Sequence, residues 1–170
     1  MKHKFLLFFL IFLAEFSYSQ DKLKQQKAID SLIQTEINKK IIDQRSSIES
    51  LKRYLDMYYQ SKSFNYDKGI IYSVLELSVI YIFEQNYEEA LKRIPEGLAR
   101  AKKSKDYLMW CKLLLCEGFI YSKLGYEKKA KKSFDESIYI LNNFKVNDDK
   151  HFLMSMIYSS IGLSSTGKKK

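Results

Sequence analysis

Three short segments of this chain repeat one pattern, in which a small residue is followed by two apolar residues and a tyrosine. Residues 78–81 read Ser-Val-Ile-Tyr, residues 118–121 read Gly-Phe-Ile-Tyr and residues 155–158 read Ser-Met-Ile-Tyr, at spacings of 40 and 37 residues. A second series, Glu-Ser-Leu-Lys-Arg at 49–53 and Glu-Ala-Leu-Lys-Arg at 89–93, has the same spacing of 40. Two interleaved series with a period between about 20 and 50 residues indicate one structural unit that is repeated and stacked along the chain.

The repeated unit is predicted to be a hairpin of two helices. The sequence holds one proline and six glycines among 170 residues, and no segment sustains an alternation of apolar and polar residues. Apolar residues instead recur at helical intervals, for example at Leu91, Ile94 and Leu98, which favours helices throughout. The expected hairpins span residues 29–60, 67–102 and 107–141, within a repeat domain at 20–163.

The last predicted helix, at residues 149–161, has no return arm before a polar and basic tail at 164–170. Repeat arrays need a polar cap at their ends, whereas Met154, Ile157 and Ile161 would leave apolar surface open. We therefore expect either self-association through this helix or a chain that is a shortened version of a longer protein.

Residues 1–19 have the pattern of a secretory signal peptide. Two lysines precede an unbroken apolar run at 5–13, and small residues at Ser17 and Ser19 place the expected cleavage after Ser19. The alternative is an uncleaved membrane anchor, but this run is shorter than the roughly 18 to 20 residues that span a bilayer, and Glu15 interrupts any extension. The expected location is therefore the periplasm or the medium outside the cell, with no transmembrane span after cleavage.

The chain is basic, with 29 Lys and Arg against 20 Asp and Glu and a formal net charge of +9. Clustered lysines can bind nucleic acids or anionic lipids. Here the lysines are spread over expected helix ends, outer faces and the tail, as at 102–103, 128–132 and 168–170. Export would also separate the chain from nucleic acid, so we expect solvated faces and no nucleic-acid partner.

No constellation of residues predicts an enzyme. His151 would be the sole histidine left after signal cleavage, and the sequence has no phosphate-binding loop and no HExxH, G-x-S-x-G or CxxC motif. Cys111 and Cys116 lie five positions apart on one expected helix, point in different directions and are expected to stay unbridged. The expectation is a non-enzymatic protein with no catalytic residue, no cofactor and no metal site.

The second and third hairpins resemble tetratricopeptide repeats. In that family, small residues lie where the two helices of a hairpin approach most closely, and aromatic residues lie at the turn. The matching residues are Leu77, Ser78, Tyr81, Tyr87, Ala90, Ile94 and Gly97 in one copy, and Gly118, Tyr121, Gly125, Tyr126, Ala130, Phe134 and Ser137 in the next. Two positions depart from the family pattern, because Glu117 replaces the usual leucine and Ser50 replaces the usual alanine.

The resemblance implies an all-α fold, a right-handed solenoid of about seven helices. The period near 40 is similar to that of a long-helix variant of the family, which resembles the exported repeat regions of bacterial AraC-type regulators and sensor histidine kinases. In such an array a partner binds to the inner, concave face, which the forward helices line. The lining residues implied here are Tyr72, Leu75, Val79, Phe83, Lys112, Leu115, Phe119, Lys123, Phe152, Met156 and Ser159.

This mostly apolar groove, with lysines at its rim, suits an apolar or amphipathic peptide or protein segment that carries an acidic residue. An alternative is that the chain fills the groove itself, for instance with the helix before residue 40. The expected function is protein or peptide binding by an exported repeat scaffold. The alternative function is the N-terminal sensor portion of a transmembrane signalling regulator, of the AraC or histidine-kinase type, without its output domain.

Overall fold

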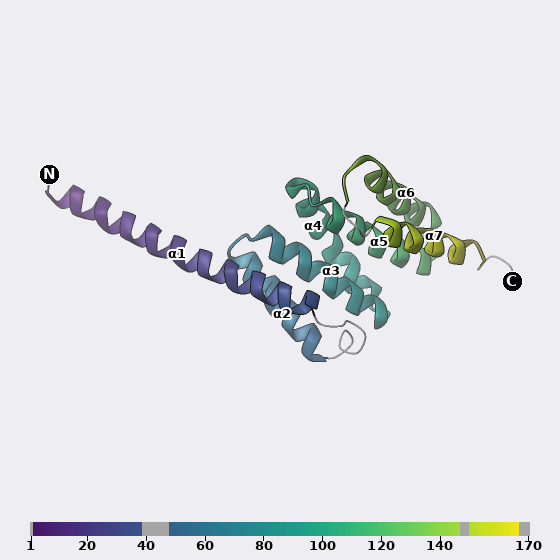
Figure 1. The fold of residues 1–170 in the computed structure, drawn as a ribbon. Coiled ribbons are helices and arrows are strands. Elements are labelled where there is room, and N and C mark those ends of the chain that lie inside the picture. The colour runs from purple at the N-terminus through teal and green to yellow at the C-terminus, as the bar shows by residue number, and fades with distance from the viewer. Residues whose placement is uncertain (1, 39–47, 147–149, 167–170) are drawn as a thin grey trace.

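The computed structural model describes residues 2–38, 48–146 and 150–166, and these residues form seven helices and no strand (Figure 1). The all-α repeat fold predicted from the sequence is confirmed. The helices are α1 (Lys2–Asn38), α2 (Ile48–Ser63), α3 (Asp67–Phe83), α4 (Tyr87–Ser104), α5 (Tyr107–Lys123), α6 (Glu127–Asn143) and α7 (Lys150–Thr166).

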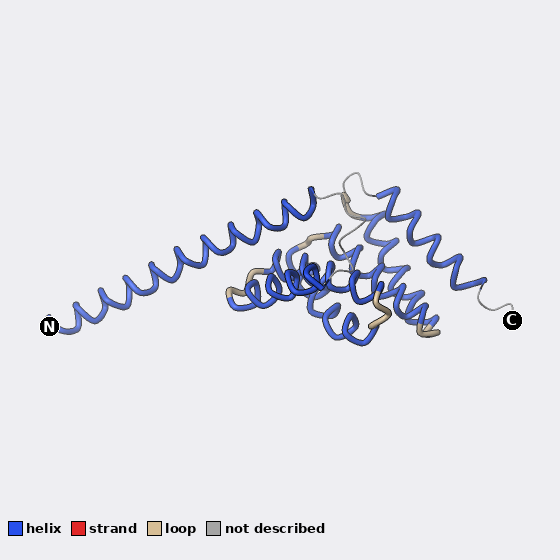
Figure 2. Tube along the Cα trace, turned by 90° about the horizontal axis from the view of Figure 1, so that it is seen from below, coloured by secondary structure: helices blue, strands red, loops and turns tan. Residues whose placement is uncertain are grey.

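The helices form two layers. The forward helices α1, α3, α5 and α7 pack in that order, each against the next, and the return helices α2, α4 and α6 each pack against the forward helices before and after them. Within the described ranges, the backbones of successive return helices do not approach each other closely, although side chains can bridge them, as from Tyr58 to Glu96. A forward helix therefore forms the floor of the space between two return helices. The size of the surrounding side chains determines whether that space is filled. Figure 2 shows the same helices from below.

The turns between the helices repeat one backbone conformation every 20 residues. Asn65, Gln85, Lys105 and Gly125 all have positive φ, at 51°, 58°, 59° and 76°. After each of them, the next N–H donates to the carbonyl five residues back, as from Asn86 to Tyr81 at 2.8 Å. This is the hydrogen bond of a Schellman motif, which ends a helix with one left-handed residue. Glycine fits that conformation without cost, and the other three residues cost about 1 kcal/mol each.

The small residues that the repeat pattern places between the helices of a hairpin lie in the core. Ser78 and Ala90 are fully buried in one hairpin, and Ala130 is buried in the next. Gly118 faces the ring of Phe134, because a Cβ added to this glycine would lie 2.6 Å from the Cε1 atom of the ring. Forward and return helices can approach this closely only because these side chains are small or absent.

The helix α1 docks on the array through its second half and extends beyond the body of the molecule at its N-terminal end (Figure 1). Ile29 and Ile33 are buried, and Gly69 of α3 makes room for Ile29, since an added Cβ would lie 3.0 Å from the Cγ2 atom of that isoleucine. This part of α1 is the forward arm of the first hairpin. Residues 39–47 of the expected first hairpin lie outside the described residues.

Two carboxylates of α1 hold this docking in place. Asp30 accepts hydrogen bonds from the hydroxyl of Tyr66 at 2.6 Å and pairs with the ammonium of Lys68 at 2.8 Å. Burial opposes ionisation of Asp30, but these two donors outweigh it and lower the pKa of the carboxyl. Glu36 accepts from Arg53 at 2.7 Å and from Tyr54 at 3.0 Å. The polar contacts therefore fix the register of α1 against α2 and the start of α3.

The first helix is continuous through the expected signal segment, and the last helix is longer than predicted. Residues 2–19 of the expected signal segment fall within the continuous helix α1, and cleavage of the segment stays a prediction. Among the described helices, none combines the length and the apolar content that a bilayer span requires. At the other end, α7 continues to Thr166, past the expected end at residue 161, because Gly162 stays helical rather than adopting the left-handed conformation of Gly125.

Candidate binding surfaces

The eleven residues predicted to line the inner face divide into three groups in the structure. Those that belong to the core are Tyr72, Leu75 and Leu115. The half-buried ones are Val79, Lys112 and Phe119, and the exposed ones are Phe83, Lys123, Phe152, Met156 and Ser159. The accessible part of the predicted surface is thus smaller than the sequence indicated.

The first hairpin covers one of the buried positions. The ring of Tyr72 lies 6.3 Å from that of Tyr54 on α2, and the Tyr54 hydroxyl donates to Glu36 of α1. Burial and the surrounding carboxylates raise the pKa of Tyr54, so it is a protonated donor. A partner could reach Tyr72 only by displacing this contact.

The exposed positions include large apolar side chains on two forward helices, α3 and α7. Phe83 at the end of α3 is 67% exposed, and Phe152 and Met156 on α7 are 65% and 44% exposed. On α5, which packs between these two helices, the ammonium of Lys123 lies 5.2 Å from the ring centre of Phe119. This forward-helix surface combines apolar side chains with a cation.

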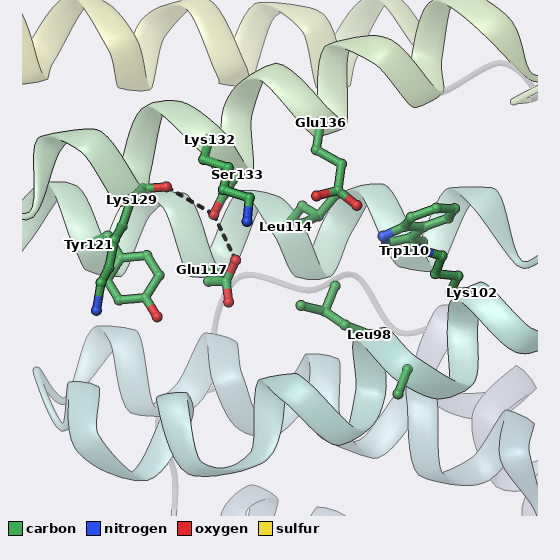
Figure 3. A pocket seen from close by; sticks show the side chains of 11 residues that line it. Leu98, Lys102, Trp110, Leu114, Glu117, Tyr121, Lys129, Lys132, Ser133 and Glu136 are labelled. Atoms are coloured by element: carbon green, nitrogen blue, oxygen red, sulfur yellow. Dashed lines mark hydrogen bonds between the residues drawn. The ribbon is translucent and has the colours of Figure 1, made fainter.

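A pocket of about 380 Å³, which the repeat pattern does not predict, lies on the opposite side of α5 (Figure 3). Helix α5 forms its floor, and α4 and α6 form its walls. The floor residues follow one face of the helix, whereas the predicted inner-face residues of α5 follow the opposite face. The lining residues are Leu98, Ala99, Lys102, Trp110, Leu114, Glu117, Tyr121, Lys129, Lys132, Ser133 and Glu136.

The floor of the pocket is apolar except for Glu117, and its rim is charged. Ser133 donates from its hydroxyl to Glu117 Oε2 at 2.6 Å, a contact drawn in Figure 3. Lys102 lies over the ring of Trp110 at 5.3 Å, and Lys129 lies over Tyr121 at 5.2 Å. Such cation–π contacts hold the ammonium groups at the rim without neutralising them. Glu117 occupies the position where the repeat pattern has leucine, so this departure from the pattern is part of the pocket.

The equivalent space one repeat earlier, between α2 and α4, is filled. Its floor residues Ile70, Val74 and Leu77 have no exposed surface. Tyr58 from α2 is buried there, and Arg93 from α4 lies over the Tyr81 ring at 5.3 Å.

Forty positions on, the large side chains of this filled groove are replaced by small ones. Leucine stands at 98 in place of Tyr58, alanine at 99 in place of Tyr59, and serine at 133 in place of Arg93. The pocket is open because the replacements of Tyr58 and Arg93 remove two side chains that fill the preceding groove, whereas Tyr59 is itself 60% exposed. These replacements can be read from the sequence alone when the two copies are aligned residue by residue.

The described residues do not present a cluster of side chains that could hold a metal ion. No group of three or more histidine, cysteine or acidic side chains is arranged to hold a metal within the described ranges. His151 is exposed on α7. Cys111 is buried, its Sγ atom lies 2.8 Å from Ser137 Oγ, and burial raises the pKa of its thiol, so it is a packing residue rather than a thiolate.

Comparison with known proteins identifies the family to which this chain belongs. Residues 32–117, from the docked part of α1 to the middle of α5, match the family described as anaphase-promoting complex subunit 5, which is a family of tetratricopeptide-like helical repeats. No curated protein and no solved structure matches the chain. The expected similarity to exported repeat regions of AraC-type regulators and sensor histidine kinases stays a prediction.

Proposed function

Because the chain belongs to the family described as anaphase-promoting complex subunit 5, a family of tetratricopeptide-like helical repeats, we propose that it is a non-enzymatic scaffold that binds a protein partner. Helical-repeat arrays present extended surfaces built from equivalent positions of successive units, which suits them to bind other chains. The partner segment is a peptide or protein surface with apolar side chains and at least one acidic residue.

The observation that carries this proposal is the exposure of large apolar side chains on the forward helices. Phe83, Phe152 and Met156 occupy positions that the repeat pattern assigns to a binding face, and each is exposed by more than four-tenths. Covering such a side chain gains about 1.5–3 kcal/mol. Lys112 and Lys123 on α5 supply the charge that an acidic residue of the partner would meet.

The test uses the partner recovered by affinity capture from cell-envelope extracts. The double variant Phe83→Asp with Phe119→Asp puts two charges on this surface, and we expect its affinity for that partner to fall at least roughly tenfold. The helical circular dichroism should stay unchanged, because Phe83 is 67% exposed and Phe119 is half-buried at the surface. The measurement is a binding titration with the purified partner.

A matched control is Tyr139→Asp on α6, since this tyrosine is 59% exposed but lies on a return helix. Its partner affinity should equal that of the unaltered protein. Undiminished binding by the Phe83→Asp and Phe119→Asp variant would remove this surface as the binding site.

Export forms the second part of the proposal, and it rests on the lysines and the apolar run in the first 13 residues. The chain would act in the periplasm or outside the cell after cleavage behind Ser19. Cleavage there leaves Ile29, Asp30 and Ile33, so the docked part of α1 is retained. The mass of the protein isolated from the envelope fraction should correspond to a chain that begins at Gln20, and a full-length mass in the cytoplasmic fraction would exclude export.

A further inference from the structure

The filled groove of the preceding repeat shows how a tyrosine is held in this architecture. The hydroxyl of Tyr58 donates to Glu96 Oε2 across the groove at 2.5 Å, and Lys62 donates to the same hydroxyl oxygen at 3.2 Å. Burial and the bond to Glu96 raise the pKa of Tyr58, so the phenol keeps the proton that it donates. The groove thus combines an apolar floor for the ring with an acceptor and a cation for the hydroxyl.

The open pocket keeps these partner groups and lacks the tyrosine. Forty positions after Glu96 and Lys62 the sequence has Glu136 and Lys102, again a carboxylate and an ammonium, and both line the pocket. The tyrosine itself is replaced by Leu98. An acceptor and a donor for a phenol therefore line a cavity in which no side chain takes the place of Tyr58.

The carboxylate of Glu136 is available for such a ligand. Glu96 in the preceding groove also pairs with Arg100, but isoleucine stands forty positions after that arginine. Among the described residues, Glu136 has no hydrogen bond or ion pair, and Figure 3 shows its side chain directed into the pocket between Leu114 and Trp110. A half-buried carboxylate gains most from a donor that arrives with an apolar body, because the body excludes water from the bond.

We propose that the pocket between α4, α5 and α6 binds a tyrosine side chain of a partner protein, which takes the place that Tyr58 occupies one repeat earlier. Its ring would lie on Leu114 and Trp110, and its hydroxyl would donate to Glu136 and accept from Lys102. That the tyrosine belongs to a partner rests on the proposed scaffold role, whereas the forward-helix surface plays no part in it. The cavity of about 380 Å³ lies within the size range of small-ligand sites.

The partly buried position of its carboxylates, rather than the net charge of the pocket, favours a phenol over an acidic side chain. Its three lysines include Lys102 and Lys129 at the rim, held over aromatic rings, while the carboxylates Glu117 and Glu136 are both partly buried. An acidic ligand would have to enter beside two carboxylates, and like charges repel at this range. A neutral donor avoids that repulsion and satisfies Glu136.

The test uses the chain's one tryptophan, Trp110, which lines the pocket and reports its occupancy by fluorescence. The probes are N-acetyl-tyrosinamide and N-acetyl-phenylalaninamide, excited where tyrosine does not absorb. We expect saturable binding of the tyrosine probe, and binding of the phenylalanine probe that is roughly tenfold or more weaker, because it cannot donate to a charged acceptor. Equal binding of the two probes, or stronger binding of N-acetyl-glutamic acid α-amide, which keeps its side-chain carboxylate, would overturn the proposal.

Two variants locate the binding. Leu98→Tyr fills the pocket as Tyr58 fills the preceding groove, so it should abolish probe binding and raise the thermal midpoint. Glu136→Gln should reduce the affinity for the tyrosine probe toward that for the phenylalanine probe and leave the latter unchanged. Glu84→Gln, at an exposed site beyond the end of α3, is the control and should change neither.

The Phe83→Asp and Phe119→Asp variant separates this inference from the proposed function. It should lose partner affinity and still bind the tyrosine probe, because its substitutions lie away from the pocket lining. Retained probe binding by Leu98→Tyr, or no effect of Glu136→Gln, would show that the tyrosine probe does not occupy this pocket.

Discussion

Leucine in place of Gly118 is expected to destabilise the repeat domain by about 3 kcal/mol or more, which is the cost of overpacking a tight core. A Cβ at this position would lie 2.6, 2.8 and 3.0 Å from three ring atoms of Phe134, and that ring is itself 1% exposed. The ring cannot withdraw without moving α6 away from α5. The measurement is the free energy of unfolding from urea denaturation followed by circular dichroism.

Gly162→Leu is the matched control, since this glycine also lies within a forward helix but nothing stands within 4 Å of an added Cβ. Leucine has the higher helix propensity, so the control should be neutral or slightly stabilising. Similar losses of stability for the two variants would show that the cost comes from leucine itself and not from the Phe134 contact.

The preceding repeat suggests how the Gly118 position can be repaired. Its equivalent pair is Ser78 and Ile94, both fully buried, so a slightly larger residue in the forward helix accompanies a smaller one in the return helix. The double variant Gly118→Ser with Phe134→Ile should therefore be more stable than Gly118→Ser alone. A double-mutant cycle measures this coupling, and strictly additive effects would argue against a direct exchange of volume between the two positions.

The fold was predictable because it is determined by features that recur. The period of 40, the small residues at 78, 90, 118 and 130 and the turns at Asn65, Gln85 and Gly125 all agree with one another in the sequence. Each repeat therefore supports the helix boundaries predicted for the other, as is expected when the local conformational preferences of the residues agree with the overall fold.

The pocket was not predictable in the same way, because it depends on differences between the copies. Glu117 and Leu98 differ from the residues at the equivalent positions one repeat earlier, Leu77 and Tyr58. A search for residues that the copies share does not detect such differences. The number of accessible residues on the inner face was overestimated for a related reason. Helical spacing identifies which face of α3 and α5 a residue occupies, but burial of Tyr72, Leu75 and Leu115 depends on how closely neighbouring hairpins pack.

Aspartate in place of Ile33 is expected to release the docked part of α1 from the array. Ile33 is 2% exposed, and Ile29, at 1%, is the next buried residue on the same face of the helix. An ionised carboxylate without a partner cannot stay in that apolar contact. The helix would undock, at a cost of about 3 kcal/mol or more in lost burial of the two isoleucines. The bonds from Tyr66 to Asp30 and from Arg53 to Glu36 would be lost with it.

The effect should stay local, which distinguishes it from that of Gly118→Leu. In a linear array each unit contacts its neighbours alone, so α5 and α6 do not sense the loss of α1. Hydrogen exchange should therefore accelerate in residues 20–38 and at the start of α3, while the amides of α5 and α6 keep their protection. Leu32→Asp is the control, because this neighbouring residue is 41% exposed and its replacement should leave α1 docked. Uniformly faster exchange along the whole chain would mean instead that the first hairpin is a cooperative part of the entire domain.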